Sequence, residues 1–366
     1  MPLVLKTGAS SVASQVAEHY RALILSGRIH SGERLPSIRT MAQELGISYG
    51  PIHAAFSTLE VEGLVHRHPR VGTVVGSGPF QVPASMELGV IFRAVPAWTQ
   101  GDNYGLGMFH GIQKALTDGS HKTVLFTPSF EGREIAADVV RQFVEHSAHG
   151  FVVDDWVPDD VVAQMAATGR PVAVIDRKCP VDGVSSVYRD NAQAARETAR
   201  QIVAHGHRVV SCICRDTWNS HQAADAFLAA MYEANLAIPA KRVGMYYDEI
   251  PDDGLKEFIK QIVCSVPVPT AIYCTDDLLA NMTCMNLSAS GQRIPDHISI
   301  VGTLDLPLAQ QVVPPLTTFR FEPSCIGRTA VEEVVERCRD KRRPARDIAI
   351  PGAWVERGSL ISVSVR

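Results

Sequence analysis

The chain has 366 residues, 46% of them hydrophobic and 20% charged, and a formal charge of −4 at pH 7. This ordinary globular composition predicts two or three domains. No apolar run approaches the ~18 residues of a membrane-spanning helix, and the N-terminus, MPLVLKTGAS, is too short and polar for a secretory signal. We therefore expect a cytoplasmic protein with no membrane partner. The eight cysteines lack a paired CxxC framework, which predicts reduced, mostly buried thiols.

The charge is unevenly distributed along the chain. Residues 1–78 carry seven Lys/Arg against five Asp/Glu, a balance of +2, which leaves −6 for the remainder. A basic N-terminal segment on an acidic chain favours nucleic-acid binding, although an asymmetry of this size supports such a function without establishing it.

The first 76 residues predict three helices and a pair of strands. A helix over 11–26 is followed by two short amphipathic helices within 35–64, whose apolar residues recur at i, i+3, i+4 and i+7. Gly46 is placed to end the first of the pair in the left-handed conformation, Ser48 to cap the second, and Pro51 falls in its first turn. HRHPRVG and Thr73-Val74-Val75 then predict two short strands around a turn. The pattern indicates a helix-turn-helix followed by a wing.

Several residues of this segment match a known family. Leu-Pro-Ser-x-Arg at 35–39, Leu-Gly-Ile-Ser at 45–48 and Gly-Leu-Val at 63–65 resemble the winged helix-turn-helix of GntR-type bacterial repressors. The simpler alternative is a structural helix hairpin. The resemblance implies a DNA-binding domain over residues 1–76 whose partner is a double-stranded DNA operator. The residues that we expect at the DNA are Ser37, Arg39, Ser48, Tyr49, His53, Arg67, His68 and Arg70.

Arg39 matches the arginine that GntR-type proteins use against the DNA backbone and nearby base edges. The alternative for Arg39 is a helix-surface ion pair with Glu44, at the unfavourable spacing i+5. For the histidines of the wing, a solvated turn and a DNA contact are equally good interpretations. Tyr49 and Pro51 replace the Arg and Thr of many relatives, so the operator sequence cannot be inferred from the family.

After a Gly-, Pro- and Ser-rich linker at 77–86, short apolar runs alternate with helical segments. This alternation predicts an α/β domain over 87–366, with parallel sheets in two lobes and a ligand at the carboxyl ends of the strands. The predicted strands lie at 88–92, 124–126, 150–153, 171–176, 209–214, 270–274 and 298–302. The predicted helices lie at 103–117, 134–146, 191–205, 222–235, 277–290 and 324–339.

GHRVV at 206–210, IPDHISIVG at 294–302 and PPLTTF at 314–319 closely resemble the effector domain of LacI/GalR-type regulators. The resemblance implies a two-lobed periplasmic-binding-protein-like domain and a homodimer formed through it. It also implies a small-molecule effector, such as a sugar or a nucleobase, between the lobes. A GntR-like head on a LacI-like body is similar in arrangement to arabinose repressors of the AraR type.

Carried over by position, the resemblance places Tyr104, Arg177, Asp190 and Asp276 at the effector, whereas Asp277 is expected to cap the following helix. Two usual contact positions are changed, to Ala223 and to Leu304. Three explanations remain open: a different set of residues completes the sugar site, the effector is another kind of molecule such as a nucleoside or a protein partner, or the site is degenerate. The additional candidates are Trp98, Trp218, Asn219 and Asp305. For Trp218, simple packing in a loop is the alternative.

Other patterns indicate structure and not chemistry. Cys212 and Cys214 point to one face of a buried strand, which favours core packing over a metal site despite the nearby His205 and His207. The acidic pairs at 154–155, 159–160 and 252–253 fall at strand ends and helix starts, where capping explains them. We identify no catalytic motif, cofactor or metal ligand set.

The sequence therefore predicts a ligand-responsive transcriptional regulator, most simply a repressor, and not an enzyme. Two rival classes are less well supported. A solute-binding protein would share the two-lobed body, but it would need an export signal and would not need the DNA-binding head. An enzyme carrying pyridoxal phosphate would need a Schiff-base lysine and a body of another fold.

Overall fold

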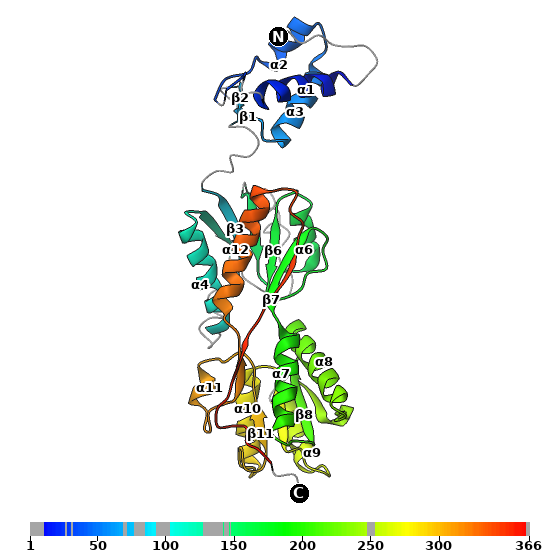
Figure 1. Cartoon of the computed structure of the whole chain (residues 1–366), viewed down its shortest axis with the longest axis vertical. Helices are drawn as coiled ribbons and strands as arrows, with labels where there is room; N and C mark the ends of the chain where they lie inside the picture. Colours follow the sequence, from blue (N-terminus) through cyan, green and yellow to red (C-terminus); the bar gives the residue numbers. More distant parts are fainter. Residues whose placement is uncertain are drawn as a thin grey trace. The chain divides into compact units, whose positions relative to one another are not determined.

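The computed structural model describes the chain at residues 11–25, 28–30, 32–68, 72–76, 85–92, 103–126, 142, 146, 148–246 and 253–363. It divides into two compact units, unit 1 (Met1–Ala84) and unit 2 (Ser85–Arg366) (Figure 1). Residues 77–84 of the predicted linker at 77–86 lie outside the described residues. Its last residue, Met86, is fully buried in unit 2, where its N–H donates to Nδ1 of His121 at 3.1 Å. Most of the predicted helix at 134–146 also lies outside the described residues.

Unit 1 has the helix order and the antiparallel strand pair of a winged helix-turn-helix. Its elements are α1 (Val12–Leu25), α2 (Ile38–Leu45), α3 (Tyr49–Val61), β1 (Val65–His68) and β2 (Gly72–Val75). Gly46 ends α2 at φ 63°, which confirms the left-handed C-cap. Ser48 is the N-cap residue of α3 as predicted, but its side chain makes no capping hydrogen bond.

The apolar faces of the three helices form the core of unit 1. Ile52, Phe56 and Leu59 of α3 are fully buried, as their spacing predicts, and the Phe56 ring meets the Tyr20 ring of α1 edge-on at 5.9 Å. At the end of α3, Glu62 accepts two hydrogen bonds from the Arg21 guanidinium, at 2.8 and 2.5 Å. Planar, charge-assisted pairing of this kind fixes the angle between α1 and α3 as well as their contact.

The first lobe of unit 2 is a sheet of six described strands in the order β13-β7-β6-β5-β3-β4, and every neighbouring pair is parallel. We call it the N-lobe. Its strands are β3 (Glu87–Ile91), β4 (Lys122–Phe126), β5 (Gly150–Val153), β6 (Val172–Ile175), β7 (Val184–Arg189) and β13 (Asp347–Ile350). Its helices are α4 (Asn103–Asp118), α6 (Asp159–Ala166) and α12 (Pro323–Arg339).

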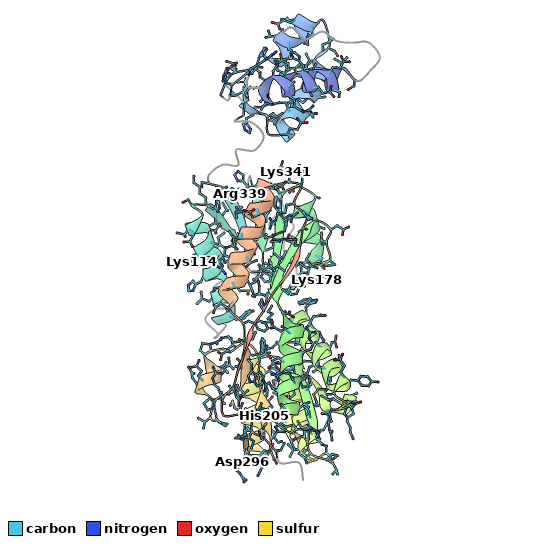
Figure 2. The ribbon with its side chains drawn as sticks, in the orientation of Figure 1. Lys114, Lys178, His205, Asp296, Arg339 and Lys341 are labelled. Carbon is cyan, nitrogen blue, oxygen red and sulfur yellow. The ribbon has the colours of Figure 1, made fainter. Side chains whose placement is uncertain are left out.

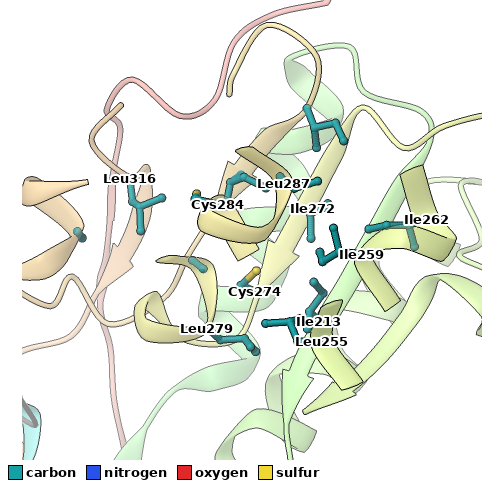
Figure 3. Packing of buried hydrophobic residues seen from close by; sticks show 14 residues of the cluster. Ile213, Leu255, Ile259, Ile262, Ile272, Cys274, Leu279, Cys284, Leu287 and Leu316 are labelled. Carbon is teal, nitrogen blue, oxygen red and sulfur yellow. The ribbon is translucent and has the colours of Figure 1, made fainter. Parts of the chain in front are cut away.

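The second lobe, the C-lobe, is a parallel sheet of four described strands in the order β11-β10-β8-β9. Its strands are β8 (Val210–Arg215), β9 (Val243–Tyr246), β10 (Ala271–Cys274) and β11 (Ser299–Val301). Its helices are α7 (Asn191–Ala204), α8 (Trp218–Glu233), η2 (Ala240–Arg242), α9 (Asp253–Val263), α10 (Asp277–Ala289) and α11 (Leu308–Gln311). Aliphatic side chains from α9, α10 and the sheet pack into one core, which includes the buried thiols of Cys274 and Cys284 (Figure 3).

The chain passes between the lobes at three places. β7 leads into α7 at Asp190, β12 (Thr318–Arg320) leads into α12, and β13 leads into β14 (Ala353–Val355), which pairs antiparallel with β12 (Figure 1). The two-lobed α/β fold with parallel sheets is therefore confirmed. The strands that end at these crossings present their carboxyl ends to the other lobe. Polar residues at these strand ends can therefore contact both lobes.

One predicted helix start and one predicted capping residue in the C-lobe are wrong. α8 begins at Trp218, four residues before the predicted start, because the Thr217 hydroxyl accepts from the N–H of Ser220 at 3.3 Å and so caps the helix there. Trp218 is thus the first residue of a helix and does not lie in a loop. At α10 the capping residue is Asp276, which accepts from the N–H of Leu279 at 2.7 Å, and not Asp277.

Helices α4 and α12 of the N-lobe cross in close contact through glycine. A Cβ atom at Gly111 of α4 would overlap the carbonyl oxygen of Ser324, and one at Gly327 of α12 would overlap that of Met108. Both obstacles are backbone atoms, which cannot move aside as a flexible side chain can. The glycines therefore set the distance between the two helices.

His207 joins the end of the chain to the C-lobe. Its imidazole is buried, with Nδ1 at 2.9 Å from Oγ1 of Thr270 and Nε2 at 3.0 Å from the carbonyl oxygen of Ile361. The carbonyl requires a donor, so Nε2 carries the proton and Nδ1 accepts from the threonine hydroxyl. Burial lowers the pKa of His207 to about 4.

We predict that His207 makes unit 2 less stable in acid. Because the folded pKa is lowered from 6.5, the stabilisation is complete above pH 6.5 and is lost as the pH falls towards 4. The full effect is roughly 3 kcal/mol. Urea unfolding of unit 2 at pH 7, 6 and 5 should show that the stability difference between wild type and His207→Gln shrinks as the pH falls. The exposed His110 offers a control, and a difference as constant with pH as that of His110→Gln would contradict the prediction.

Candidate functional site

The predicted DNA-contacting residues of α2 and α3 lie at the surface of unit 1. We call Ser37, Arg39, Ser48, Tyr49 and His53 the recognition surface; all five are exposed. Ser37 also caps α2, since its hydroxyl accepts from the N–H of Thr40 at 3.1 Å. The Tyr49 side chain is 56% exposed, and its ring lies 5.6 Å from that of His53.

Arg39 forms no hydrogen bond or ion pair with another described residue. Glu44 is also exposed, and the ion pair with Arg39 considered as an alternative is not formed between these two described residues. Arg39 therefore presents its guanidinium to the solvent beside the start of α2, where it is available to an anionic partner.

The Arg67 side chain is bonded to other residues of unit 1. From strand β1 its Nη2 donates to the carbonyl oxygen of His53 at 3.1 Å and to Oγ of Ser57 at 3.0 Å, and its Nε lies 3.3 Å from Oε2 of Glu60. These contacts fix the wing against α3, so Arg67 positions the wing. The side chain of His68 and the whole of Arg70 lie outside the described residues.

A group of polar residues bridges the lobes of unit 2; we call Asp176, Arg189, Asn191 and Asn219 the interlobe cluster. Asn219, on α8 of the C-lobe, donates from Nδ2 to the carbonyl oxygen of Asp176 at 2.6 Å and to its Oδ2 at 3.2 Å. Oδ1 of Asn219 accepts from Nδ2 of Asn191 at 2.7 Å. All three side chains are buried, so these bonds act in a poorly solvated site where each is strengthened.

Arg189 and Asp176 lie at the carboxyl ends of adjacent strands, β7 and β6. Nε of Arg189 is 3.8 Å from Oδ1 of Asp176, and the guanidinium lies 5.1 Å from the centre of the Tyr104 ring. Burial alone would lower the pKa of Arg189, but the Asp176 carboxylate and the Tyr104 hydroxyl reverse this and raise it. Asp176 adopts φ 57°, a conformation that costs energy outside glycine and is common at functional sites.

The structure brings three of the predicted effector residues to this junction. Tyr104 is 6% exposed in the first turn of α4, against Arg189. Trp218 meets the Tyr188 ring edge-on at 5.7 Å, and its neighbour Asn219 belongs to the cluster. Trp98 lies outside the described residues. Arg189, Asp176 and Asn191 were missed by sequence reasoning, although the rule that ligands bind at the carboxyl ends of parallel strands could have indicated them.

The other predicted effector residues have structural partners. Arg177 donates to the carbonyl oxygens of Asp155 at 2.6 Å and Val157 at 2.8 Å, and pairs with Asp159 at 2.7 Å. This set uses each nitrogen of the guanidinium to hold the loop after β5. Asp190 caps α7 by accepting from the N–H of Gln193 at 2.8 Å.

Asp276 and Asp305 are each paired with an arginine. Oδ2 of Asp276 accepts from Nε of Arg215 at 3.0 Å, in addition to capping α10. Oδ1 of Asp305 accepts from Nη2 of Arg357 at 2.5 Å. The second of these pairs ties the turn after β11 to the segment after β14, which places Asp305 at the crossing of the chain between the lobes.

The two changed positions offer no replacement for the missing contacts. Ala223 is buried on α8, and Leu304 has φ 107° in the turn after β11. Among the described residues, no group of three or more His, Cys, Asp or Glu could hold a metal ion. No described helix is both long and apolar enough to span a bilayer.

Comparison with known proteins agrees with both units. Residues 12–75 match the profile of bacterial regulatory proteins of the gntR family, and residues 199–360 match that of a periplasmic binding protein-like domain. An HTH-type transcriptional repressor PurR of Photobacterium profundum is 25% identical over 244 residues, 65% of this chain and 72% of that repressor.

Solved structures of similar fold include regulators with bound sugars. A LacI family transcriptional regulator from Enterococcus faecium with bound ribose has a TM-score of 0.62 and 18% identity, over 76% of this chain and all of that one. A transcriptional regulator CelR–cellobiose complex has a TM-score of 0.64 and 18% identity, over 89% of this chain and all of that one.

The chain thus joins a GntR-type helix-turn-helix domain to a periplasmic-binding-protein-like domain with the fold of LacI-family regulators. It is a DNA-binding transcriptional regulator.

Proposed function

We propose that this regulator is a repressor that binds its operator as a homodimer through the recognition surface and responds to a sugar or sugar derivative bound at the interlobe cluster. Effector binding changes the relation of the lobes, and with it the spacing of the two DNA-binding units on successive half-sites. The observation that carries the proposal is the bridge from Asn219 of the C-lobe to Asp176 of the N-lobe. A ligand that inserts here must exchange hydrogen bonds with both lobes.

The chemistry of the cluster suits a polyhydroxyl ligand. A carboxylate, a guanidinium and two amides, on Asp176, Arg189, Asn191 and Asn219, provide donors and acceptors that pair with adjacent hydroxyl groups. The Tyr104 and Trp218 rings nearby provide flat apolar surfaces of the kind that pack against a sugar ring. The ribose and cellobiose held by the two regulators of similar fold belong to the same class of ligand.

Exposed apolar side chains on α10 support a homodimer formed through unit 2. Met285 is 65% exposed and Leu278 43% exposed, and their spacing of seven residues places them on one helix face. Large apolar groups grouped in this way favour burial against a second copy of the chain.

We predict that Arg39→Ala weakens DNA binding to all sequences and lowers the dependence of log K on log salt by roughly one unit. The exposed guanidinium neutralises one phosphate, and its loss leaves one fewer counterion to be released. Filter binding or fluorescence anisotropy across a salt series checks this. Arg28→Ala, which removes an exposed charge outside the recognition surface, is the control. An unchanged slope for Arg39→Ala would show that Arg39 does not lie at a phosphate.

The whole proposal is tested by footprinting on DNA upstream of the protein's own gene, combined with a thermal-shift screen of pentoses, hexoses, sugar acids and nucleosides. A ligand at 100 times its dissociation constant stabilises the folded protein by about 2.7 kcal/mol, which is readily detected. We expect a protected site whose affinity changes with the stabilising sugar. Absence of protection with and without ligand would refute DNA binding, and stabilisation by nucleosides alone would refute the sugar.

A further inference from the structure

A cavity of about 370 Å³ lies in the N-lobe, at the amino ends of strands β6 and β7. Its walls are the turn before β6, the turn before β7 and the end of α12. The side chains that matter here are Arg170, Asp182, Arg337, Lys341 and Arg343, and we call the space that they line the basic cavity. Figure 2 shows Lys341 and Lys178 at opposite ends of the N-lobe; Lys178 follows β6 on the side of the interlobe cluster. The basic cavity is therefore separate from the effector site.

The basic cavity carries four cationic side chains and one carboxylate, that of Asp182. Arg337 makes no ion pair with a described residue. Its Nη1 donates to the carbonyl oxygen of Val172 at 3.3 Å and to Oγ of Ser185 at 3.2 Å, and its Nη2 donates to the carbonyl oxygen of Gly183 at 2.8 Å. Its buried Nε has no hydrogen-bond partner among the described residues. Neutral carbonyl and hydroxyl oxygens orient the guanidinium without cancelling its charge.

Arg343 and Lys341 are also incompletely neutralised. The nearest carboxylate contacts of Arg343, to Glu333 at 3.4 Å and Glu336 at 3.8 Å, are long, and Arg346 approaches Glu333 more closely. The exposed Lys341 makes no hydrogen bond or ion pair with a described residue. Burial lowers the pKa of both Arg170 and Arg337, which shows that desolvation outweighs the stabilisation of their charges by neighbouring groups.

We propose that the basic cavity binds the phosphate group of a small phosphorylated metabolite, with Arg337 and Lys341 as its principal cationic contacts. An anion there supplies the negative charge that the surrounding protein lacks, and charge-assisted hydrogen bonds from arginine and lysine to phosphate are stronger than neutral ones. The basic cavity is concave and has the volume of a small-molecule site. The phosphates of duplex DNA, by contrast, are contacted on open surfaces. The ligand would give the regulator a second chemical input, at the end of the N-lobe where β3 begins.

Isothermal titration of the full-length protein with inorganic phosphate, ribose 5-phosphate and ribose tests this proposal. We expect saturable binding of both phosphate compounds. Lys341→Gln should weaken this binding about tenfold, because a charge-assisted hydrogen bond is lost, and Asp182→Asn should strengthen it. Arg342→Gln is the matched control, since it removes the same charge from the next residue, whose exposed side chain pairs with Asp340 at 3.5 Å. Its affinity for phosphate should equal that of the wild type.

Each of the following outcomes would overturn the proposal. The first two are a failure of phosphate to bind, and binding to Lys341→Gln that is as tight as to the wild type. Equal losses in Lys341→Gln and Arg342→Gln would indicate a diffuse surface charge. Displacement of phosphate by ribose would place the anion at the interlobe cluster. If Lys341→Gln weakens binding to duplex DNA while phosphate does not bind, the cations serve the DNA backbone and the small-molecule site is refuted.

Discussion

Gly327→Ala is expected to destabilise unit 2 by about 3 kcal/mol, although the same change in an ordinary helix interior stabilises by up to ~1 kcal/mol. The added Cβ would overlap the carbonyl oxygen of Met108 and would lie 2.9 Å from the amide nitrogen of Ile112, both in α4. Neither atom can yield without moving that helix. The two helices must therefore separate, which loosens the packing of buried side chains on both.

Thermal unfolding of unit 2, followed by circular dichroism, measures the effect of Gly327→Ala. Gly111→Ala should behave in the same way, because its Cβ would meet the carbonyl oxygen of Ser324. Gly254→Ala on α9 is the control: a Cβ there meets nothing within 4 Å, so its stability should equal or slightly exceed that of the wild type. If Gly327→Ala also unfolds at or above the wild-type temperature, the close approach of α4 and α12 is not what the glycines maintain.

Features that depend on neighbouring residues in the sequence were predictable. Gly46 ends α2 because a left-handed residue is needed one position beyond an amphipathic run, and the periodicity alone identified Ile52, Phe56 and Leu59 as core. The alternation of apolar runs with helical segments was sufficient for the two-lobed fold, since each strand is short and most are buried on both faces.

Features that depend on the exact position of one residue, such as a helix cap, were harder to predict from the sequence. Asp276 and Asp277 both precede the apolar face of α10, and the sequence does not decide which of them has the extended backbone of a cap. In the structure Asp277 is inside the helix and fully buried, where Leu306 N–H and the Thr318 hydroxyl donate to its carboxylate. Burial outweighs these donors and raises the pKa of Asp277 to about 7.

Features that depend on the crossings between lobes could not be predicted. Arg189 ends β7 and Asp176 follows β6, and from the sequence each could equally be a solvated residue at a strand end. They meet because β6 and β7 are neighbours and both end at the junction. The same limit applies to Arg67, whose place on the wing suggested a contact with DNA. Its bonds to α3 follow from how the wing folds back on that helix.

Asn219→Ala is expected to weaken the response to the effector strongly while leaving DNA binding without effector unchanged. This prediction rests on the proposed function. The amide of Asn219 donates to Asp176 and accepts from Asn191, so its removal breaks the side-chain bridge between the lobes and leaves polar groups of both buried residues without that partner. The cost of such unpaired groups is about 1–3 kcal/mol, so unit 2 should also unfold more readily.

The two readouts separate a binding role for Asn219 from a structural one. With the sugar that most stabilises the wild type, Asn219→Ala should show at least about tenfold weaker binding, the factor that ~1.4 kcal/mol of lost interaction produces. Gln222→Ala, an exposed substitution on the same helix, should retain wild-type affinity. If Asn219→Ala is less stable but binds the sugar normally, Asn219 only joins the lobes. The effector must then bind elsewhere, because a ligand that changes the relation of the lobes has to interact differently with their two arrangements.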